Sequence, residues 1–113
     1  MNQAPDFVQS VPKPDWQPLP REGVVGVKYR VLLHRRGMAV AALRFAANAT
    51  IDEHSAAFEI DVICLGGEGF VSVGGKAMPF RCGEFVTWPA QVNHRLWTED
   101  VAMETLMVEH HEA

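Results

Sequence analysis

The sequence predicts an all-β domain built as a sandwich or a closed barrel. From Gly23 onward the 113-residue chain consists of short apolar or alternating stretches, separated by glycine-rich and polar turns. Eight or nine such stretches follow at nearly regular spacing, and no segment carries a strong helical pattern. The length suits one domain with its own hydrophobic core.

Residues 1–20 are predicted to form an extended arm ahead of this domain, which takes residues 21–113. Five of the seven prolines lie in the arm, and proline interrupts both helices and central strands. Apolar side chains such as Phe7, Trp16 and Leu19 accompany them, which a free disordered tail rarely carries. We therefore expect the later part of the arm to lie against the domain or a partner subunit.

Turn signals divide the domain into its strands. Residues 34–37 and 74–76 are predicted hairpin turns, in which glycine supplies the unusual backbone dihedrals. The glycines at 66, 67 and 69 predict a turn or bulge, and residues 46–50 are too short for a helix. The expected strands take residues 24–34, 38–46, 57–65, 70–73, 77–80, 85–88, 94–97 and 101–109.

Composition and charge exclude several partners. The formal net charge is −4, and the longest cationic run, Arg35 and Arg36, lies in a predicted turn, which argues against nucleic acid. No apolar run is long enough to span a bilayer, and the proline-rich, acidic start does not resemble a signal peptide. We expect cytoplasmic residence and no membrane partner.

The remaining reactive side chains indicate no further site. Cys64 and Cys82 have no CxxC spacing, so neither a zinc knuckle nor a disulfide framework is indicated, and both are expected to be buried. We expect His34, His110 and His111 to be exposed and without function, because the first lies in a turn and the others near the chain end.

One stretch, residues 83–97, organises the rest of the chain. Gly83 precedes a short strand over residues 85–88, and Pro89 ends it because proline cannot donate a ladder hydrogen bond. After a turn, His94 opens the next strand, where its imidazole can point into a barrel. The sequence therefore predicts a candidate site at His94, with the other strands as its wall.

This stretch resembles the second sequence motif of the cupin family. Gly83, Pro89 and His94 match its glycine, proline and histidine, while Gln91 replaces the middle glycine and Thr98 takes the place of the usual asparagine. Residues 67–75 are similar to the hairpin that joins the two cupin motifs. The resemblance covers most of the domain and implies a small single-domain, RmlC-like cupin. Its fold is a double-stranded β-helix, or jelly-roll barrel.

The first cupin motif, which supplies two histidines and a glutamate, matches in two alternative registers. In one register His54 and Glu59 take the places of the second histidine and the glutamate, and Asp52 stands at the first histidine. In the other register His54 takes the first histidine's place, and Ala56 and Ile60 stand at the other two ligand positions.

Strand alternation favours the second register. Ile60, Val62 and Cys64 share one face of a strand, while Glu59 and Asp61 begin the other. A barrel interior takes the uniformly apolar row, which places Ile60 inside. A bulge just before Glu59 would turn that carboxylate inward instead, so both registers stay open.

The resemblance implies a divalent transition metal, Mn, Fe, Ni or Zn, held by His54 and His94 with Glu59 as third ligand. The alternative is a pocket without metal, in which the two histidines are hydrogen-bonded polar groups. Five side chains on the inward faces or beside the organising turn are predicted to line the pocket: Ile60, Val62, Cys64, Trp88 and Trp97.

Three functions follow from these alternatives. One is a metal-dependent enzyme of oxygenase, isomerase or lyase type that acts on a small organic molecule in the barrel. The second is a metal-free module that binds or senses a small molecule at a degenerate cupin site. The third is a structural β-barrel subunit whose pocket is vestigial. We also expect a homodimer, since isolated jelly rolls have exposed sheet edges, with Val101, Met103 and Met107 as a packing face.

Overall fold

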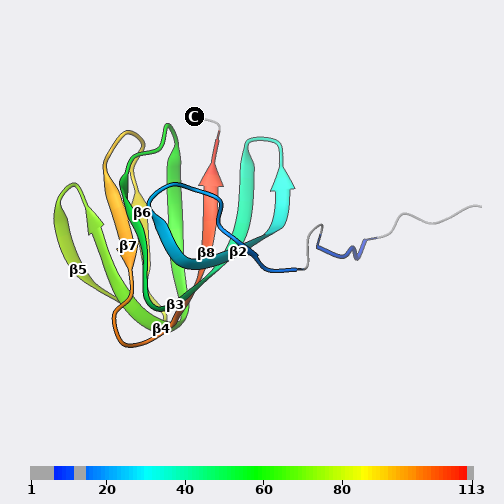
Figure 1. Ribbon diagram of the computed structural model, residues 1–113. Coiled ribbons are helices and arrows are strands. Elements are labelled where there is room, and N and C mark those ends of the chain that lie inside the picture. Colours follow the sequence, from blue (N-terminus) through cyan, green and yellow to red (C-terminus); the bar gives the residue numbers. More distant parts are fainter. Residues whose placement is uncertain (1–6, 12–14, 112–113) are drawn as a thin grey trace, which may run out of the picture.

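The computed structural model describes residues 7–11 and 15–111, which form eight strands (Figure 1). The strands are β1 (Gln17–Pro18), β2 (Val24–Arg35), β3 (Met38–His54), β4 (Glu59–Val73), β5 (Lys76–Arg81), β6 (Phe85–Trp88), β7 (His94–Trp97) and β8 (Met103–His110). Within the described ranges there is no helix long and apolar enough to cross a membrane.

Two long, bent strands, β3 and β4, organise the barrel. The first part of β3 pairs with β2 and β8, and its last part pairs with β7. The first part of β4 pairs with β6 and β8, and its last part pairs with β5 and β7. Because β7 and β8 each bridge β3 and β4, the antiparallel ladder closes on itself, which confirms the predicted jelly-roll barrel.

The polar bend expected after residue 46 lies within β3 and does not end it. Asn48 adopts a left-handed conformation, with φ of 59°. The buried hydroxyl of Thr98 accepts a hydrogen bond from the Ala49 N–H at 2.9 Å and donates one to the Ala46 carbonyl. This bridge holds the bend, so β3 continues to His54 and carries that residue to the barrel interior.

The glycine-rich stretch of β4 likewise bends a strand where the sequence predicted a break between two. Pairing with β8 shifts register between Cys64 and Gly66, and Gly67 has φ of 69°. A Cβ at Gly67 would overlap the Ala102 carbonyl oxygen. Glycine therefore lets β4 pass close to the start of β8 without interruption.

Alternate residues of the strands form the core. The prediction that Met103 and Met107 form an outward packing face is wrong, because they point inward with Thr105 in the alternation of β8. Val101, just before β8, is exposed, and so is Cys82, against the expectation of two buried thiols. The largest fully buried side chains include Phe45, Val62, Val71, Trp88, Leu96 and Met103.

The predicted arm lies partly outside the described residues, which omit 1–6 and 12–14. Residues 7–11 lie away from the barrel in Figure 1, and Phe7 and Val8 are exposed. Further on, β1 pairs with β2, and the Trp16 ring lies 4.7 Å from the Arg30 guanidinium and 4.1 Å from that of Arg44. The later part of the arm therefore contacts the domain.

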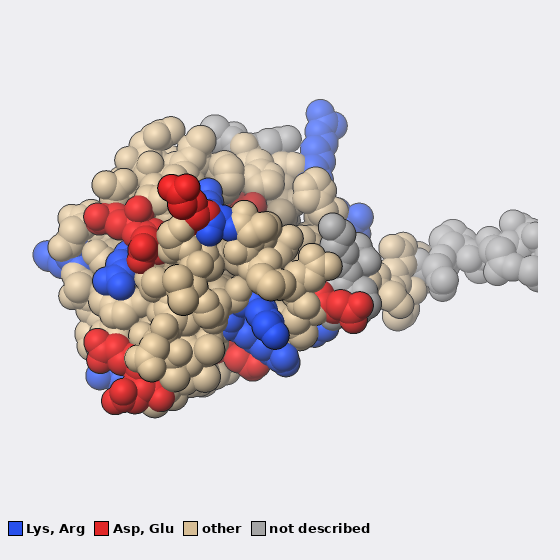
Figure 2. All heavy atoms as spheres, in the orientation of Figure 1, with Lys and Arg blue, Asp and Glu red and all other residues tan. Residues whose placement is uncertain are grey.

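The surface charges are mixed in sign. Acidic and basic side chains lie near one another on the face shown in Figure 2. Arg44 pairs with Glu104 at 3.3 Å, and Arg95 lies 3.9 Å from a carboxylate oxygen of Asp52. Neighbouring opposite charges therefore offset one another over this surface.

Candidate functional site

The two histidines singled out from the sequence meet inside the barrel. His54 ends β3 and His94 begins β7, and the two residues lie directly opposite each other in the antiparallel ladder. Their Nε2 atoms are 3.3 Å apart, and the rings meet edge to face at 73°. His94 is fully buried, whereas His54 is half-buried.

The turn ahead of His94 is anchored on both sides. Pro89 ends β6, and Gln91 then adopts a left-handed conformation with φ of 65°, which explains why the cupin motif has glycine at this position. The Gln91 N–H donates to the Ala56 carbonyl at 2.7 Å, and the Asn93 carbonyl accepts from the Gly74 N–H at 2.8 Å. These contacts hold the imidazole of His94 in place.

Trp88, the last residue of β6, covers one face of His94. The two rings are nearly parallel, at 9°, with centroids 3.8 Å apart. Neither Trp88 Nε1 nor His94 Nδ1 has a hydrogen-bond partner, although both are buried. Burial lowers the pKa of His94 to about 4. The nearby His54 ring and the charge of Arg21 add to this effect, and the Val92 backbone opposes it. His94 is therefore neutral at neutral pH.

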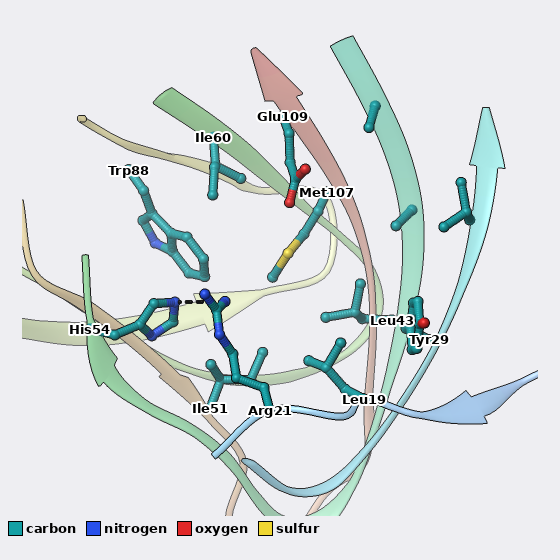
Figure 3. A pocket seen from close by; sticks show the side chains of 13 residues that line it. Leu19, Arg21, Tyr29, Leu43, Ile51, His54, Ile60, Trp88, Met107 and Glu109 are labelled. Atoms are coloured by element: carbon teal, nitrogen blue, oxygen red, sulfur yellow. Dashed lines mark hydrogen bonds between the residues drawn. The ribbon is translucent and has the colours of Figure 1, made fainter. Parts of the chain in front are cut away.

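Arg21 completes the polar side of the site. Its Nη1 lies 3.2 Å from His54 Nε2, as the dashed line in Figure 3 marks. His54 Nδ1 lies 2.8 Å from the Asp52 carbonyl oxygen, which can only accept, so the proton is assigned to Nδ1. His54 Nε2 then accepts from Arg21 and from the Nε2–H of His94. We call Arg21, His54 and His94 the inner group.

No pattern in the sequence marks Arg21, because non-local pairing brings it to the site. The Leu19 N–H donates to the Val27 carbonyl at 3.0 Å, and the Asp52 N–H donates to the Gly23 carbonyl at 2.8 Å. These bonds tie the chain on both sides of Arg21 to the barrel wall. The only signal in the sequence is its place at the junction of the predicted arm and domain.

A cavity of about 270 Å³ adjoins the inner group. Figure 3 shows Arg21 and His54 on one side and the carboxylate of Glu109, from β8, pointing in from another. No pattern in the sequence indicates Glu109 as a pocket residue. The rest of the wall is mainly apolar and includes Tyr29, Leu43, Ile51, Ile60, Trp88 and Met107.

The apolar row of β4 has the predicted parity. Ile60, Val62 and Cys64 are all buried, so the register that turns Ile60 inward is the observed one. Of the predicted lining residues, Ile60 and Trp88 reach the cavity. Val62 and Cys64 lie in the barrel core and do not contribute to the cavity wall.

Trp97 was expected in the pocket but lies on the other side of its strand. His94 and Leu96 point inward from β7, so strand alternation turns Trp97 outward. Its ring stacks on Phe70 with centroids 5.7 Å apart, and the Arg95 guanidinium covers it at 4.2 Å. Trp97 therefore packs against the outer surface of the barrel.

Glu59, the predicted third metal ligand, is not brought to the two imidazoles. Because it precedes the inward-facing Ile60, it faces outward, beside Asp61 and opposite His110 of β8. The ligand atoms of Glu59, Asp61 and His110, which we call the outer group, lie within 4.8 Å of one another. His110 was expected to be exposed but is half-buried in this group.

Both carboxylate oxygens of Asp61, in the outer group, already have hydrogen-bond partners. Asp61 accepts from the Thr87 hydroxyl at 2.6 Å, and His110 Nε2 lies 2.9 Å from its other oxygen. The hydrogen bonds from Thr87 and His110 lower the pKa of Asp61. This carboxylate therefore stays ionised and tied to both neighbours.

The inner group fits a metal ion incompletely. The two Nε2 atoms are 3.3 Å apart. If a cation lay about 2.1 Å from each of them, the nitrogen–metal–nitrogen angle would be about 100°, which is normal for two ligands of one ion. However, the only cluster of three His, Cys, Asp or Glu ligand atoms among the described residues is the outer group. Arg21 also engages the lone pair of His54, and its charge repels a cation.

No protein-family model and no curated protein sequence matches the chain. Solved structures do. A polyketide cyclase from Streptomyces resistomycificus is similar with a TM-score of 0.81 and 16% identity, over 96% of this chain and 81% of that one. An RmlC-like cupin from Shewanella frigidimarina has a TM-score of 0.79 and 17% identity, over 99% and 96% of the two chains.

A protein from Thermotoga maritima described as a predicted oxalate decarboxylase has a TM-score of 0.79 and 20% identity, over 95% of this chain and all of its own. Identities this low establish the fold alone. The chain has the cupin fold, in its small, single-barrel, RmlC-like form.

Proposed function

We propose that the barrel binds a small organic molecule and that this binding needs no metal ion. The observation that supports this most is the mainly apolar cavity with polar groups of the inner group on one side, which is the usual form of a small-molecule site. Its volume of about 270 Å³ lies just below the range of roughly 300–1,000 Å³ for ligand pockets, so the ligand is fragment-sized.

The inner group supplies directional contacts within this cavity. Arg21 has N–H groups beyond the one on His54, and the contact with His54 Nε2 holds its guanidinium in place. The edge of Trp88 and the thioether of Met107 provide an apolar surface against which a flat or branched body packs. The pocket therefore suits a ligand with one polar end and an apolar body.

A metal-dependent enzyme is the second candidate function. The 3.3 Å spacing of the two Nε2 atoms favours it, and proteins of similar structure are named as a polyketide cyclase and a predicted oxalate decarboxylase. Such a role needs Arg21 to leave His54 and a further ligand to come from the substrate or water. Both imidazoles would then hold the ion, which supplies Lewis-acid chemistry when bound.

Metal content and melting curves separate the two candidates. The protein is purified without chelators or nickel affinity, analysed for metals, and melted with and without manganese, iron(II), nickel and zinc. We expect no bound metal at the inner group and no stabilisation that depends on it. Any stabilisation should persist in His54→Ala and disappear in Asp61→Asn, which alters the outer group.

The opposite pattern would overturn the proposal in favour of the metal-dependent enzyme. Stabilisation lost in both His54→Ala and His94→Ala, but kept in Asp61→Asn, would place the ion at the inner group. Glu59→Gln serves as a second control for the outer group, since its side chain lies on the other side of β4.

We also propose that the chain acts as a homodimer in the cytoplasm. Among the described strands, β5 pairs only with β4, which leaves a sheet edge that natural proteins normally cover. Leu65 and Phe85 add exposed apolar surface nearby on the outside of the barrel. Light scattering should give twice the chain mass, and Phe85→Ser should shift the equilibrium toward monomer; a monomeric wild type contradicts the proposal.

A further inference from the structure

Two charged side chains face the cavity, and they carry opposite signs. Figure 3 shows the Arg21 guanidinium beside His54 and the Glu109 carboxylate pointing inward from β8, with the Met107 side chain between them. Glu109 lies opposite Ile60 in the ladder between β4 and β8. One end of the cavity is therefore positively charged and the other negatively charged, and the wall between them is mainly apolar.

Arg21 has capacity for an anion. Its contact in the cavity is a neutral imidazole, and none of the ion pairs among the described residues involves Arg21. A guanidinium presents five N–H donors in a planar fork that matches the two oxygens of a carboxylate. One donor rests on His54, so the others can bind a carboxylate while His54 positions the fork.

Glu109 limits the negative charge that a ligand can carry at the end of the cavity away from Arg21. Its carboxylate oxygen lies 2.9 Å from His111 Nε2, and the side chain is only partly exposed. The ring of His111 packs edge to face on Phe58, at 4.6 Å between centroids, which holds this pair at the rim. A second negative charge on a ligand would lie beside this carboxylate and be repelled by it, with water at the rim screening part of the repulsion.

We propose that the cavity selects a small monocarboxylate with an apolar body. Arg21 binds the carboxylate, and Trp88 and Met107 contact the body. Glu109 rejects a second carboxylate at the far end of the ligand. This inference rests on the proposed binding function and adds to it the charge and the class of the ligand.

Three probes of one skeleton test the inference by calorimetric titration of the full chain. They are 3-phenylpropionate, its uncharged amide 3-phenylpropanamide, and 4-(2-carboxyethyl)benzoate, which carries a second carboxylate at the far end. We expect 3-phenylpropionate to bind about tenfold to hundredfold more tightly than the amide, as hydrogen bonds to charged groups imply. The dicarboxylate should bind at least about tenfold more weakly than the monocarboxylate.

Charge-removing variants assign these preferences to residues. Arg21→Gln should abolish the preference for the acid over the amide while leaving amide affinity nearly unchanged. Glu109→Gln should bring the dicarboxylate close to the monocarboxylate. Arg81→Gln removes an exposed cation from the end of β5, away from the cavity, and should alter none of the three affinities. Melting curves check that each variant is folded.

The outcomes distinguish failure of the inference from failure of the proposed function. Equal affinities of acid and amide in the wild-type protein would overturn the role of Arg21 and leave a small-molecule pocket in place. Equal affinities of the two acids would overturn the role of Glu109. Absence of binding by all three probes would contradict the proposed function itself.

Discussion

At the start of β4, the inward side of the strand faces the cavity beside the inner group, and the outward side carries the outer group. Ile60 faces the cavity beside the inner group, while its neighbour Glu59 faces outward in the outer group. The outer group has the mixture of ligand types that metals prefer, but it lies on the surface. The inner group has enclosure and a shaped cavity, but only two metal-ligand side chains. Ligand-type residues alone therefore do not locate a pocket; strand alternation decides which of them reach it.

The two groups also differ in charge and in hydrogen bonding. Arg21 leaves the inner group positive, because the geometry and the low pKa of His94 describe two neutral imidazoles. In the outer group, Asp61 is ionised and already bound by Thr87 and His110. The inner group is therefore suited to receive an anion, whereas the outer group is largely satisfied by its own contacts.

The largest expected effect on the free energy of unfolding comes from placing a charged side chain on the inward side of β4. Ile60→Glu would place a carboxylate in the apolar wall and should lower the free energy of unfolding by about 3 kcal/mol or more, measured by urea denaturation at neutral pH. Its matched control, Glu59→Gln, should change it by less than about 0.5 kcal/mol. A well-tolerated Ile60→Glu would contradict the description of position 60 as part of an enclosed, apolar wall.

A second prediction uses the pH dependence of stability. The pKa of His94 is about 4 in the folded barrel and returns toward 6.5 on unfolding. Below about pH 6.5 the unfolded chain therefore binds a proton that the folded chain does not, so stability falls as the pH decreases toward 4. The loss is about 3 kcal/mol at most, since one pKa unit corresponds to about 1.4 kcal/mol.

Urea denaturation of chelator-treated protein at several pH values measures this effect. His94→Gln removes the titration and should show a shallower decline between pH 6.5 and 4 than the wild type. Identical slopes would mean that His94 is not held neutral by burial, and the description of the inner group would need revision.

The smallest effect is expected at the outer group. The pKa of Asp61 is lowered, so its stabilising contribution is present above its ordinary pKa of about 3.8 and is lost as the pH falls through the folded value. Because the pair is partly exposed, a double-mutant cycle of Asp61→Asn and His110→Gln should give a coupling below about 1 kcal/mol at neutral pH. A coupling several times larger would make this pair a structural anchor of the barrel.

Local patterns in the sequence were sufficient for the fold and for part of the site. The turn signals around Pro89 place His94 at the start of a strand, and the alternation of Ile60, Val62 and Cys64 defines the inward face of β4. Both depend only on residues near each other in the chain. The prediction of a jelly roll with His54 and His94 therefore needed no long-range information beyond the resemblance to cupins.

The missed features depend on pairing between distant segments. Arg21 reaches His54 because hydrogen bonds to Val27 and from Asp52 hold its segment on the barrel. Glu109 lines the cavity because β8 alternates inward at that residue, near an end of the strand where sequence gives the weakest signal. Trp97 was wrongly predicted to line the pocket. The alternation of side chains along a strand, which correctly placed Ile60 inside, also turns Trp97 outward.

The central claim, that the cavity binds its ligand without metal, is tested most directly by the affinity for 3-phenylpropionate with and without a chelator. Calorimetry should give one site per chain and the same dissociation constant in the presence of EDTA as after addition of zinc, nickel, manganese or iron(II). The account is contradicted if binding requires one of these ions and is lost again in both His54→Ala and His94→Ala.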